Sequence, residues 1–272
     1  MQEPVVVCSV EYDHTANNGP ATVRMQNAQS SSFAIRLQSA SPQITEVLTG
    51  RNVHCLAVEE GTWELPDGRS VQAAKYTNTV TDWRRNFEGE EQPYLLPFSS
   101  PIVVGQVMTS NDPDFCVFYS RGPDSRHDEP DSSTLRTGVH SGEYMEVIDN
   151  EVIGYIVMEG GIHADVGGGV EVESAVGPVN VRGLSQGTFL YDFVEPFGNG
   201  APEVKVISQM GMKGSDGSWA VLTTHTSSAF SFSLSLDEDQ DRDDERNHTW
   251  EAVAYVAISQ QGVVALTPVA PQ

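Results

Sequence analysis

The chain has 272 residues, 39% of them hydrophobic and 19% charged, a balance typical of folded soluble proteins and not of disordered ones. Its 38 acidic against 15 basic residues leave a formal charge of -23, which disfavours nucleic acid and anionic membranes as partners because both attract Lys and Arg. No apolar run approaches the roughly 18 residues that a membrane-spanning helix needs, so no membrane segment is expected.

The N-terminus and the cysteines bear on the compartment. Residues Met1 to Pro4 have neither the basic start nor the apolar core of a secretion signal, so we expect either a cytosolic protein or the mature part of a processed one. The three cysteines, Cys8, Cys55 and Cys116, show no C-x-x-C spacing. This odd and sparse set predicts free thiols, buried as small hydrophobic residues in a reducing compartment.

Three apolar runs stand at equal spacing and predict an internal repeat. They surround Leu56, Ile156 and Val256, which lie 100 residues apart each time. Each run is short, rich in β-branched and aromatic residues, and bounded by acidic residues or Gly, so each is predicted to be a buried strand. A fixed period of about 100 residues favours a chain built from similar units.

In chain order, each unit opens with a strand that starts at a proline and closes with one of these buried runs, and we call this part a head. The heads are residues 4–61, 101–161 and 202–261. The segments between them, residues 62–100 and 162–200, have a different residue pattern, and we call them tails. Alternating polar and apolar residues predict further strands within the heads. In the first head, the strands are expected at residues 4–10, 21–25, 33–37 and 53–58.

The count of three heads and two tails predicts the domain organisation. If each tail packs with the head that follows it, residues 62–161 and 162–261 form two complete modules. Residues 1–61 are then an N-terminal head unit without a tail, and residues 262–272 are a C-terminal extension. Helical periodicity is hard to find anywhere. We therefore predict an all-β fold of tandem antiparallel β-sandwich modules.

A head without a tail has a sheet edge or an apolar face with no cover. The extension can supply a missing strand either within the molecule or across to a neighbour, and we expect the second. The chain also has one adjacent pair of basic residues to oppose its acidic surface, Arg84 and Arg85. The predicted assembly residues are therefore Val263, Val264, Ala265, Leu266, Arg84 and Arg85.

The sequence contains partial motifs for catalysis and for metal binding, but none of them predicts a site. Residues 183–187 match G-x-S-x-G, but a strand is predicted to follow at Phe189, where a nucleophile elbow requires a helix. Asp237, Asp239 and Asp241 have the first spacings of an EF-hand, but Arg242 stands where that loop requires Gly. We expect a solvated acidic hairpin there, with a looser calcium site between Asp237 and Glu245 left open. We predict no enzyme activity, no cofactor and no metal.

The head pattern resembles the repeated domain related to H-type lectins. It consists of Pro-Val-Val-Val, a polar turn, an alternating strand with Phe, an acid-rich loop and a buried strand with Tyr. The closest matches are residues 98–114 and 241–255, and through the three heads the resemblance covers nearly all of the chain. The resemblance implies repeated β-domains.

The acidic balance, the serial modules and the odd thiols also resemble the mature part of diatom pyrenoid shell proteins. This resemblance implies a structural protein that assembles with itself into a sheet around the Rubisco condensate of the plastid, after removal of a targeting segment. Rubisco or the pyrenoid matrix would be further partners. The alternative is a lectin-like protein that stacks glycans on exposed aromatic residues. The candidates for that role are Trp63, Trp83, Trp219 and Trp250.

Overall fold

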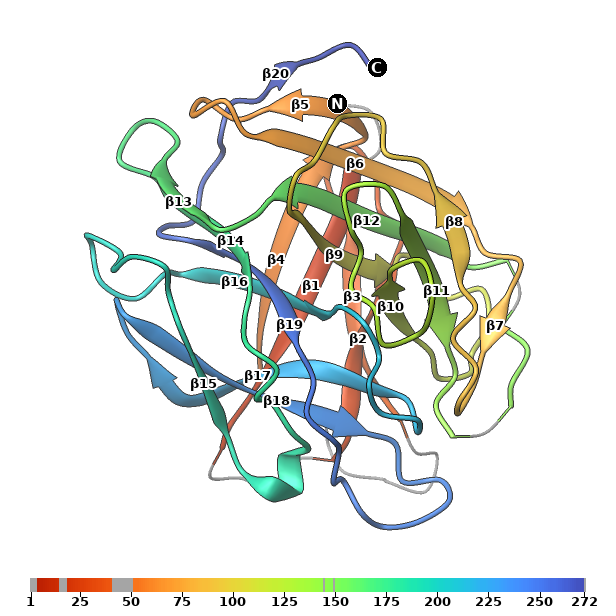
Figure 1. The fold of residues 1–272 in the computed structure, drawn as a ribbon. Helices are drawn as coiled ribbons and strands as arrows, with labels where there is room; N and C mark the ends of the chain where they lie inside the picture. The colour runs from red at the N-terminus through yellow and green to blue at the C-terminus, as the bar shows by residue number, and fades with distance from the viewer. Residues whose placement is uncertain (1–3, 15–18, 41–50, 144, 149, 272) are drawn as a thin grey trace.

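The computed structural model describes residues 4–14, 19–40, 51–143, 145–148 and 150–271. Within these ranges the chain forms twenty strands and a single 3-10 helix, η1 (Leu184–Gln186). The strands build several small, mostly antiparallel sheets around a common core, so the predicted all-β fold is confirmed (Figure 1). No helix in the described ranges is long and apolar enough to cross a membrane.

Two sheets have the same layout. In each, a strand that closes a head lies between the strand that opens the head and one strand of a hairpin from the preceding segment, and in the first sheet β20 adds beyond that hairpin. The first has the order β20 (Thr267–Pro268), β5 (Gly61–Glu64), β6 (Ser70–Thr77), β12 (Val152–Glu159) and β9 (Pro101–Val107). The second has the order β13 (Ile162–Asp165), β14 (Glu171–Val176), β19 (Val253–Ile258) and β16 (Val204–Gln209).

A third sheet joins the beginning of the chain to its last third. Its N-terminal strands pair antiparallel over eight residues, and one of them touches a C-terminal strand through a short parallel contact. The order across the sheet is β15 (Phe189–Asp192), β18 (Ser231–Glu238), β17 (Ser218–Ser227), β1 (Pro4–Tyr12) and β4 (Asn52–Glu59). β4 is therefore one edge of this sheet.

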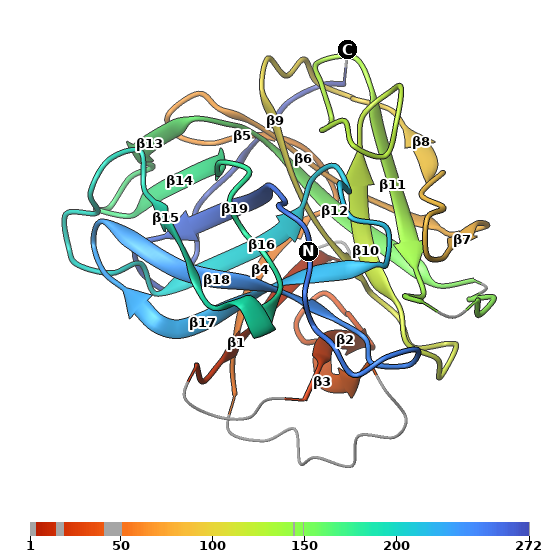
Figure 2. The ribbon, with the colours of Figure 1, turned by 60° about the horizontal axis from the view of Figure 1, so that its bottom comes forward.

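The remaining strands form two smaller sheets. Figure 2 shows one of them, a two-stranded hairpin, at the edge of the molecule next to β1. That hairpin consists of β2 (Ala21–Gln26) and β3 (Ala34–Ser39). The other sheet consists of β10 (Val117–Arg121), β11 (Leu135–His140), β7 (Thr81–Asp82) and β8 (Glu90–Gln92), the last two both pairing with β11.

Strands about 100 residues apart make the same pairings. β1 pairs with β4, β9 with β12, and β16 with β19, always antiparallel. Likewise β2 pairs with β3, β10 with β11, and β17 with β18. The three central runs of the sequence thus lie in β4, β12 and β19. A common origin of the three heads stays a prediction, but their strand pairing is alike.

Glycines redirect the chain where a head ends. Between β4 and β5 the backbone passes through Gly61 at φ +139, and between β12 and β13 it passes through Gly161 at φ +74. Residues with a side chain disfavour these backbone conformations. Each glycine therefore allows the chain to leave one sheet and start the hairpin that covers the next.

The predicted units share sheets and core. β1 and β4, from the N-terminal head, lie in one sheet with strands of the third unit, and β20 of the C-terminal extension pairs with β5. One hydrophobic cluster includes Val5, Val104 and Val256, one residue from each head. The segments 1–61 and 262–272 are thus integrated with the two central modules through shared sheets.

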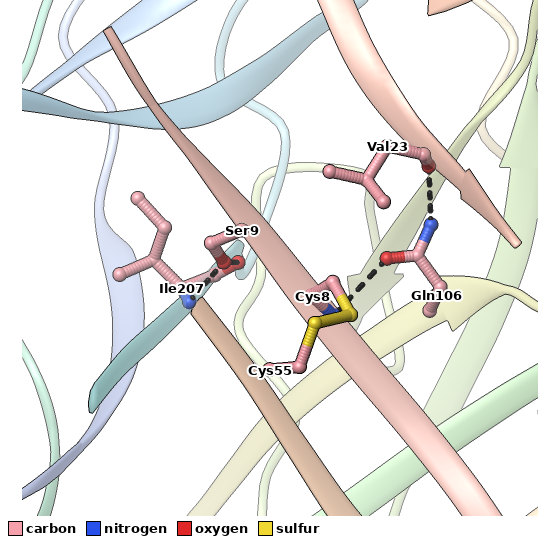
Figure 3. Close-up of a disulfide and its surroundings, with 6 residues drawn as sticks. All are labelled: Cys8, Ser9, Val23, Cys55, Gln106 and Ile207. Carbon is pink, nitrogen blue, oxygen red and sulfur yellow. Dashed lines mark hydrogen bonds between the residues drawn. A yellow bond between two sulfur atoms is a disulfide. The ribbon is translucent and has the colours of Figure 1, made fainter. Parts of the chain in front are cut away.

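The prediction of free thiols is wrong for two of the three cysteines. Cys8 and Cys55 form a disulfide (Figure 3), and Cys116 is the buried free cysteine. The antiparallel register of β1 and β4 puts Cys8 directly opposite Cys55, with 4.1 Å between their Cα atoms. A sequence separation of 47 residues gives no sign of this proximity.

Candidate functional site

β4 has one open edge where its counterparts in the other heads have none. β12 lies between β9 and β6, and β19 lies between β16 and β14. β4 pairs only with β1 among the strands that the structure describes. An unpaired edge of this kind presents a row of backbone donors and acceptors that can bind another strand.

The register identifies the groups on this edge. In an antiparallel pair, opposite residues alternate between pairs that exchange backbone hydrogen bonds and pairs that do not. The Cys8 N–H donates to Oε1 of Gln106 at 3.2 Å instead of to β4 (Figure 3). Cys8 and Cys55 therefore form a non-hydrogen-bonded pair. It follows that the N–H and C=O groups of Val53, Cys55 and Ala57 point away from β1, toward the open edge.

The inner side of the disulfide is fixed by polar contacts with other heads. Gln106, on β9, donates from Nε2 to the carbonyl of Val23 at 2.6 Å (Figure 3). Ser9 donates from Oγ to the carbonyl of Ile207 and accepts from its N–H, at 3.3 Å and 2.8 Å. β1 is thus anchored to β9 and β16, and the disulfide attaches β4 to β1.

An apolar cavity of about 660 Å³ lies along the open edge. Seven consecutive residues of β4, Val53 to Glu59, line it, as expected where a strand presents its edge and not one face. The other walls come from β5, β6, β12, the β14–β19–β16 sheet and the C-terminal segment. These walls include Trp63, Leu65, Val71, Met158, Val170, Val172, Val204, Val256, Ile258, Val263, Val264 and Leu266.

Polar groups gather at one end of the cavity. The carbonyl of Glu203 lies 3.0 Å from Nδ1 of His54, and the Glu203 carboxylate accepts from the N–H of Gln261 at 2.8 Å. The pKa of Glu11 is lowered to about 2, chiefly by its interaction with His54 and then by the amide of Asn52, while burial acts the other way. These contacts tie β4 and the C-terminal segment to the loop before β16.

The structure brings three of the predicted assembly residues to this cavity. Val263, Val264 and Leu266 line it, and Val263 is 95% exposed; Ala265 is exposed and not part of the lining. Beyond them, Thr267 and Pro268 pair with β5 of the same chain. Addition of this extension to a neighbouring molecule stays a prediction.

The predicted basic pair lies elsewhere. Arg84 and Arg85 follow β7, and neither lines the cavity. The Arg84 backbone is tied into the loop through its N–H, which donates to the carbonyl of Gly142 at 2.8 Å, and through its carbonyl, 3.1 Å from Nε2 of His140. Arg85 is exposed. The structure therefore gives these arginines no role at the open edge.

The acidic stretch 237–245 differs from the solvated hairpin that we expected. Asp237 is fully buried, and it accepts from Arg246 at 2.7 Å and from the hydroxyl of Tyr12 at 2.5 Å. Asp239 is buried as well, and burial raises its pKa to about 7. No group of three or more His, Cys, Asp or Glu in the described part of the chain is arranged to hold a metal ion. The first residues of the stretch are thus engaged in the core.

The four tryptophans have different surroundings. Trp219 is buried and donates to the carbonyl of Ala21 at 2.9 Å, while Trp63 and Trp83 are half-buried. Trp250 is 46% exposed, with the guanidinium of Arg182 over its ring at 4.8 Å. Among the tryptophans, Trp250 alone offers an exposed ring to a ligand.

Comparisons with known proteins identify no family for this chain. No family model matches the chain, and no solved structure is significantly similar to it. Over 170 residues, or 59% of the chain, the sequence is 29% identical to halomucin of Haloquadratum walsbyi. The chain spans about 2% of the length of that curated relative. The resemblance to H-type lectin-related domains and to pyrenoid shell proteins stays a prediction.

Proposed function

We propose that this chain is a structural β protein that assembles with copies of itself by accepting a further strand at the open edge of β4. The observation that carries the proposal is the difference between β4 and its two counterparts. β12 and β19 each have neighbours on both sides, whereas the described chain leaves β4 with one neighbour and an apolar cavity. Strand addition would satisfy the free backbone groups and fill apolar space together.

The strong negative charge sets the conditions for assembly. At -23 per chain, two copies repel each other unless salt screens them. The screening length falls from about 30 Å at 0.01 M to about 3 Å at 1 M ionic strength. Assembly is therefore favoured by salt, and divalent cations should act at lower concentration than monovalent ones.

A variant of Ala57 tests the proposal. The Ala57 N–H points to the open edge, so Ala57→Pro removes a donor there without removing a hydrogen bond to β1. Wild type should form sheets, tubes or oligomers as NaCl rises from about 0.01 M to about 1 M, and Ala57→Pro should stay monomeric. Ala57→Ser, which keeps the N–H, is the matched control. Sedimentation velocity and negative-stain microscopy give the readout; wild-type monomers at every salt concentration would contradict the proposal.

The finer form of this function, a shell around Rubisco in a plastid pyrenoid, stays a prediction. The Cys8–Cys55 disulfide is more typical of an oxidising compartment than of a reducing one. A stretch similar to this chain makes up about 2% of halomucin, so segments of this kind occur within much longer polypeptides. We therefore propose the assembly without a named compartment, and with the chain itself as the partner.

Glycan binding is the second candidate, and Trp250 is the observation that favours it. Its ring is 46% exposed, with Arg182 over one face and Phe189 edge-on at 6.0 Å, and an exposed aromatic ring is of the kind that stacks on sugars. A glycan array compares wild type with Trp250→Ala. Signal that disappears in the variant supports a lectin-like role, and an array without wild-type signal removes it.

A further inference from the structure

We propose that the strand accepted by the β4 edge is the C-terminal segment of a second copy of this chain, residues 260–269. The proposal rests on the assembly function argued above and names its partner. It follows from the shape of the cavity, the chemistry of the β4 edge, the composition of the segment and the way the segment is held.

The shape of the cavity selects a single strand. β4 forms one wall, and β5, β6, β12 and the β14–β19–β16 sheet form walls that stay in place when the C-terminal segment of the same chain moves away. The edge of a folded sheet would bring its own neighbouring strands and would collide with these walls. In its own chain the C-terminal segment pairs with β5 alone among the described strands, so it can lie along β4 as a single strand.

The chemistry of the edge selects a polypeptide over a hydrocarbon ligand. The outward N–H and C=O groups of Val53, Cys55 and Ala57 would lose water without gaining a partner if a lipid chain filled the cavity. An extended peptide offers a C=O and an N–H at the same spacing, while its alternate side chains enter the apolar space. A β-strand therefore satisfies both parts of the site.

The composition of the C-terminal segment suits the apolar cavity beside β4. Residues 260–272 contain no charged side chain, in a chain whose formal charge is -23. Such a segment can enter an apolar cavity without burying a charge. It also approaches an acidic neighbour without like-charge repulsion from its own side chains. Residues 263–266 of the segment are all apolar.

The segment is held lightly in its own chain. Its ladder on β5 comprises Thr267 and Pro268, followed by two hydrogen bonds between Val269 and Thr62, at 2.9 Å and 2.6 Å. The Gln261 N–H also donates to the Glu203 carboxylate at 2.8 Å. Val263 is 95% exposed, an apolar side chain left in water. Release breaks this short ladder and the packing of Val264, Leu266 and Val269 on the core, and docking on a neighbour's β4 would restore apolar contacts and also cover Val263.

The contact would be heterologous, because the donated segment and the accepting edge are different surfaces. Each copy gives one segment and accepts one, so copies add head to tail and need not close into a ring. An extended assembly of the kind proposed for this protein follows from one repeated contact.

A complementation experiment tests this contact. Ala57→Pro blocks the edge but keeps the segment, and Val263→Asp keeps the edge but puts a charge on the segment. Each variant alone should be monomeric in salt that assembles wild type, and the equimolar mixture should give a one-to-one dimer and stop there. Val179→Asp, which makes the same change at an exposed valine outside the cavity lining, should assemble like wild type.

Two further measurements keep the test independent of folding defects. Ala57→Lys is a second edge block, since the Ala57 side chain is exposed and a lysine there leaves the β1 pairing intact. A labelled synthetic peptide of residues 260–272 should bind the full-length Val263→Asp protein, whose β4 edge is free, and the same peptide with Val263→Asp should bind at least about tenfold more weakly. Fluorescence anisotropy measures both.

The outcomes separate this proposal from the function on which it rests. If wild type assembles and Val263→Asp assembles equally well, the segment is not the occupant, while assembly at the β4 edge stands. If wild type never assembles, the function fails and this proposal with it. If the two monomeric variants do not combine and the peptide does not bind, the donated strand comes from elsewhere.

Discussion

β4 and β12 are corresponding strands of successive heads, and their surroundings differ more than their sequences do. Both are apolar eight-residue runs that end in Glu. β12 is covered by β9 and β6, and its Ile156 is fully buried. β4 has β1 alone among the described strands, and the equivalent Leu56 is half-buried. Neighbouring strands, and not composition, therefore decide how buried each of these two strands becomes.

A covalent bond distinguishes the same two strands. The disulfide links β4 to β1 at the position where the second head pairs Gly105 with Tyr155. Cys8 and Cys55 therefore cross-link the head whose closing strand has a single neighbour among the described strands. The disulfide holds β4 in register where a second row of backbone hydrogen bonds holds β12.

The largest expected effect comes from truncating the two equivalent side chains. Ile156→Ala removes fully buried methyl groups and should lower the free energy of unfolding by about 2–5 kcal/mol. Leu56→Ala removes a half-buried side chain beside a cavity, and its cost should be less than half as large because little new void is created. Denaturant unfolding of monomeric protein at low salt measures both. Equal losses would show that β4 is as enclosed as β12.

Removing the disulfide should have the next largest effect. The Cys8→Ser, Cys55→Ser double variant opens a loop of 47 residues and should lose about 2–4 kcal/mol of stability. Calorimetry with and without a reducing agent measures the change. The reductant should destabilise wild type by a similar amount and leave the double variant unaffected. A wild-type protein insensitive to reductant, with free thiols by mass spectrometry, would argue against the cross-link.

Local patterns predict much of this fold, because apolar runs and turn residues act over a few positions. The expected strands at 4–10 and 53–58 lie within β1 and β4, and the strand expected at Phe189 is β15. The tail count also predicts that the first head lacks a cover, and this division of the chain stays a prediction. These inferences needed only the period of the residues and the order of the segments.

Long-range pairing accounts for what the sequence could not predict. The disulfide depends on the register of two strands separated by unrelated sequence, and the burial of Asp237 depends on Tyr12, 225 residues away. The cavity requires walls from four sheets or segments, whose packing no local pattern encodes. Charge runs are normally solvated, but Asp237 is buried at the start of this one, where it accepts hydrogen bonds from Arg246 and Tyr12.

The smallest expected effect concerns the end of the open edge. Trp63 donates from its indole N–H to the carbonyl of Glu59 at 2.7 Å, much as the Ser174 hydroxyl donates to the carbonyl of the equivalent Glu159 at the end of β12. Trp63→Phe keeps most of the apolar surface and removes this donor, and it should cost about 1 kcal/mol. Trp83→Phe, at a half-buried tryptophan outside the cavity lining, is the control in denaturant titrations.

A loss for Trp63→Phe no larger than that of the control would mean that this hydrogen bond does not stabilise β4. A larger loss, with slower hydrogen exchange at β12 than at β4, would show that side-chain capping replaces only part of what a neighbouring strand provides.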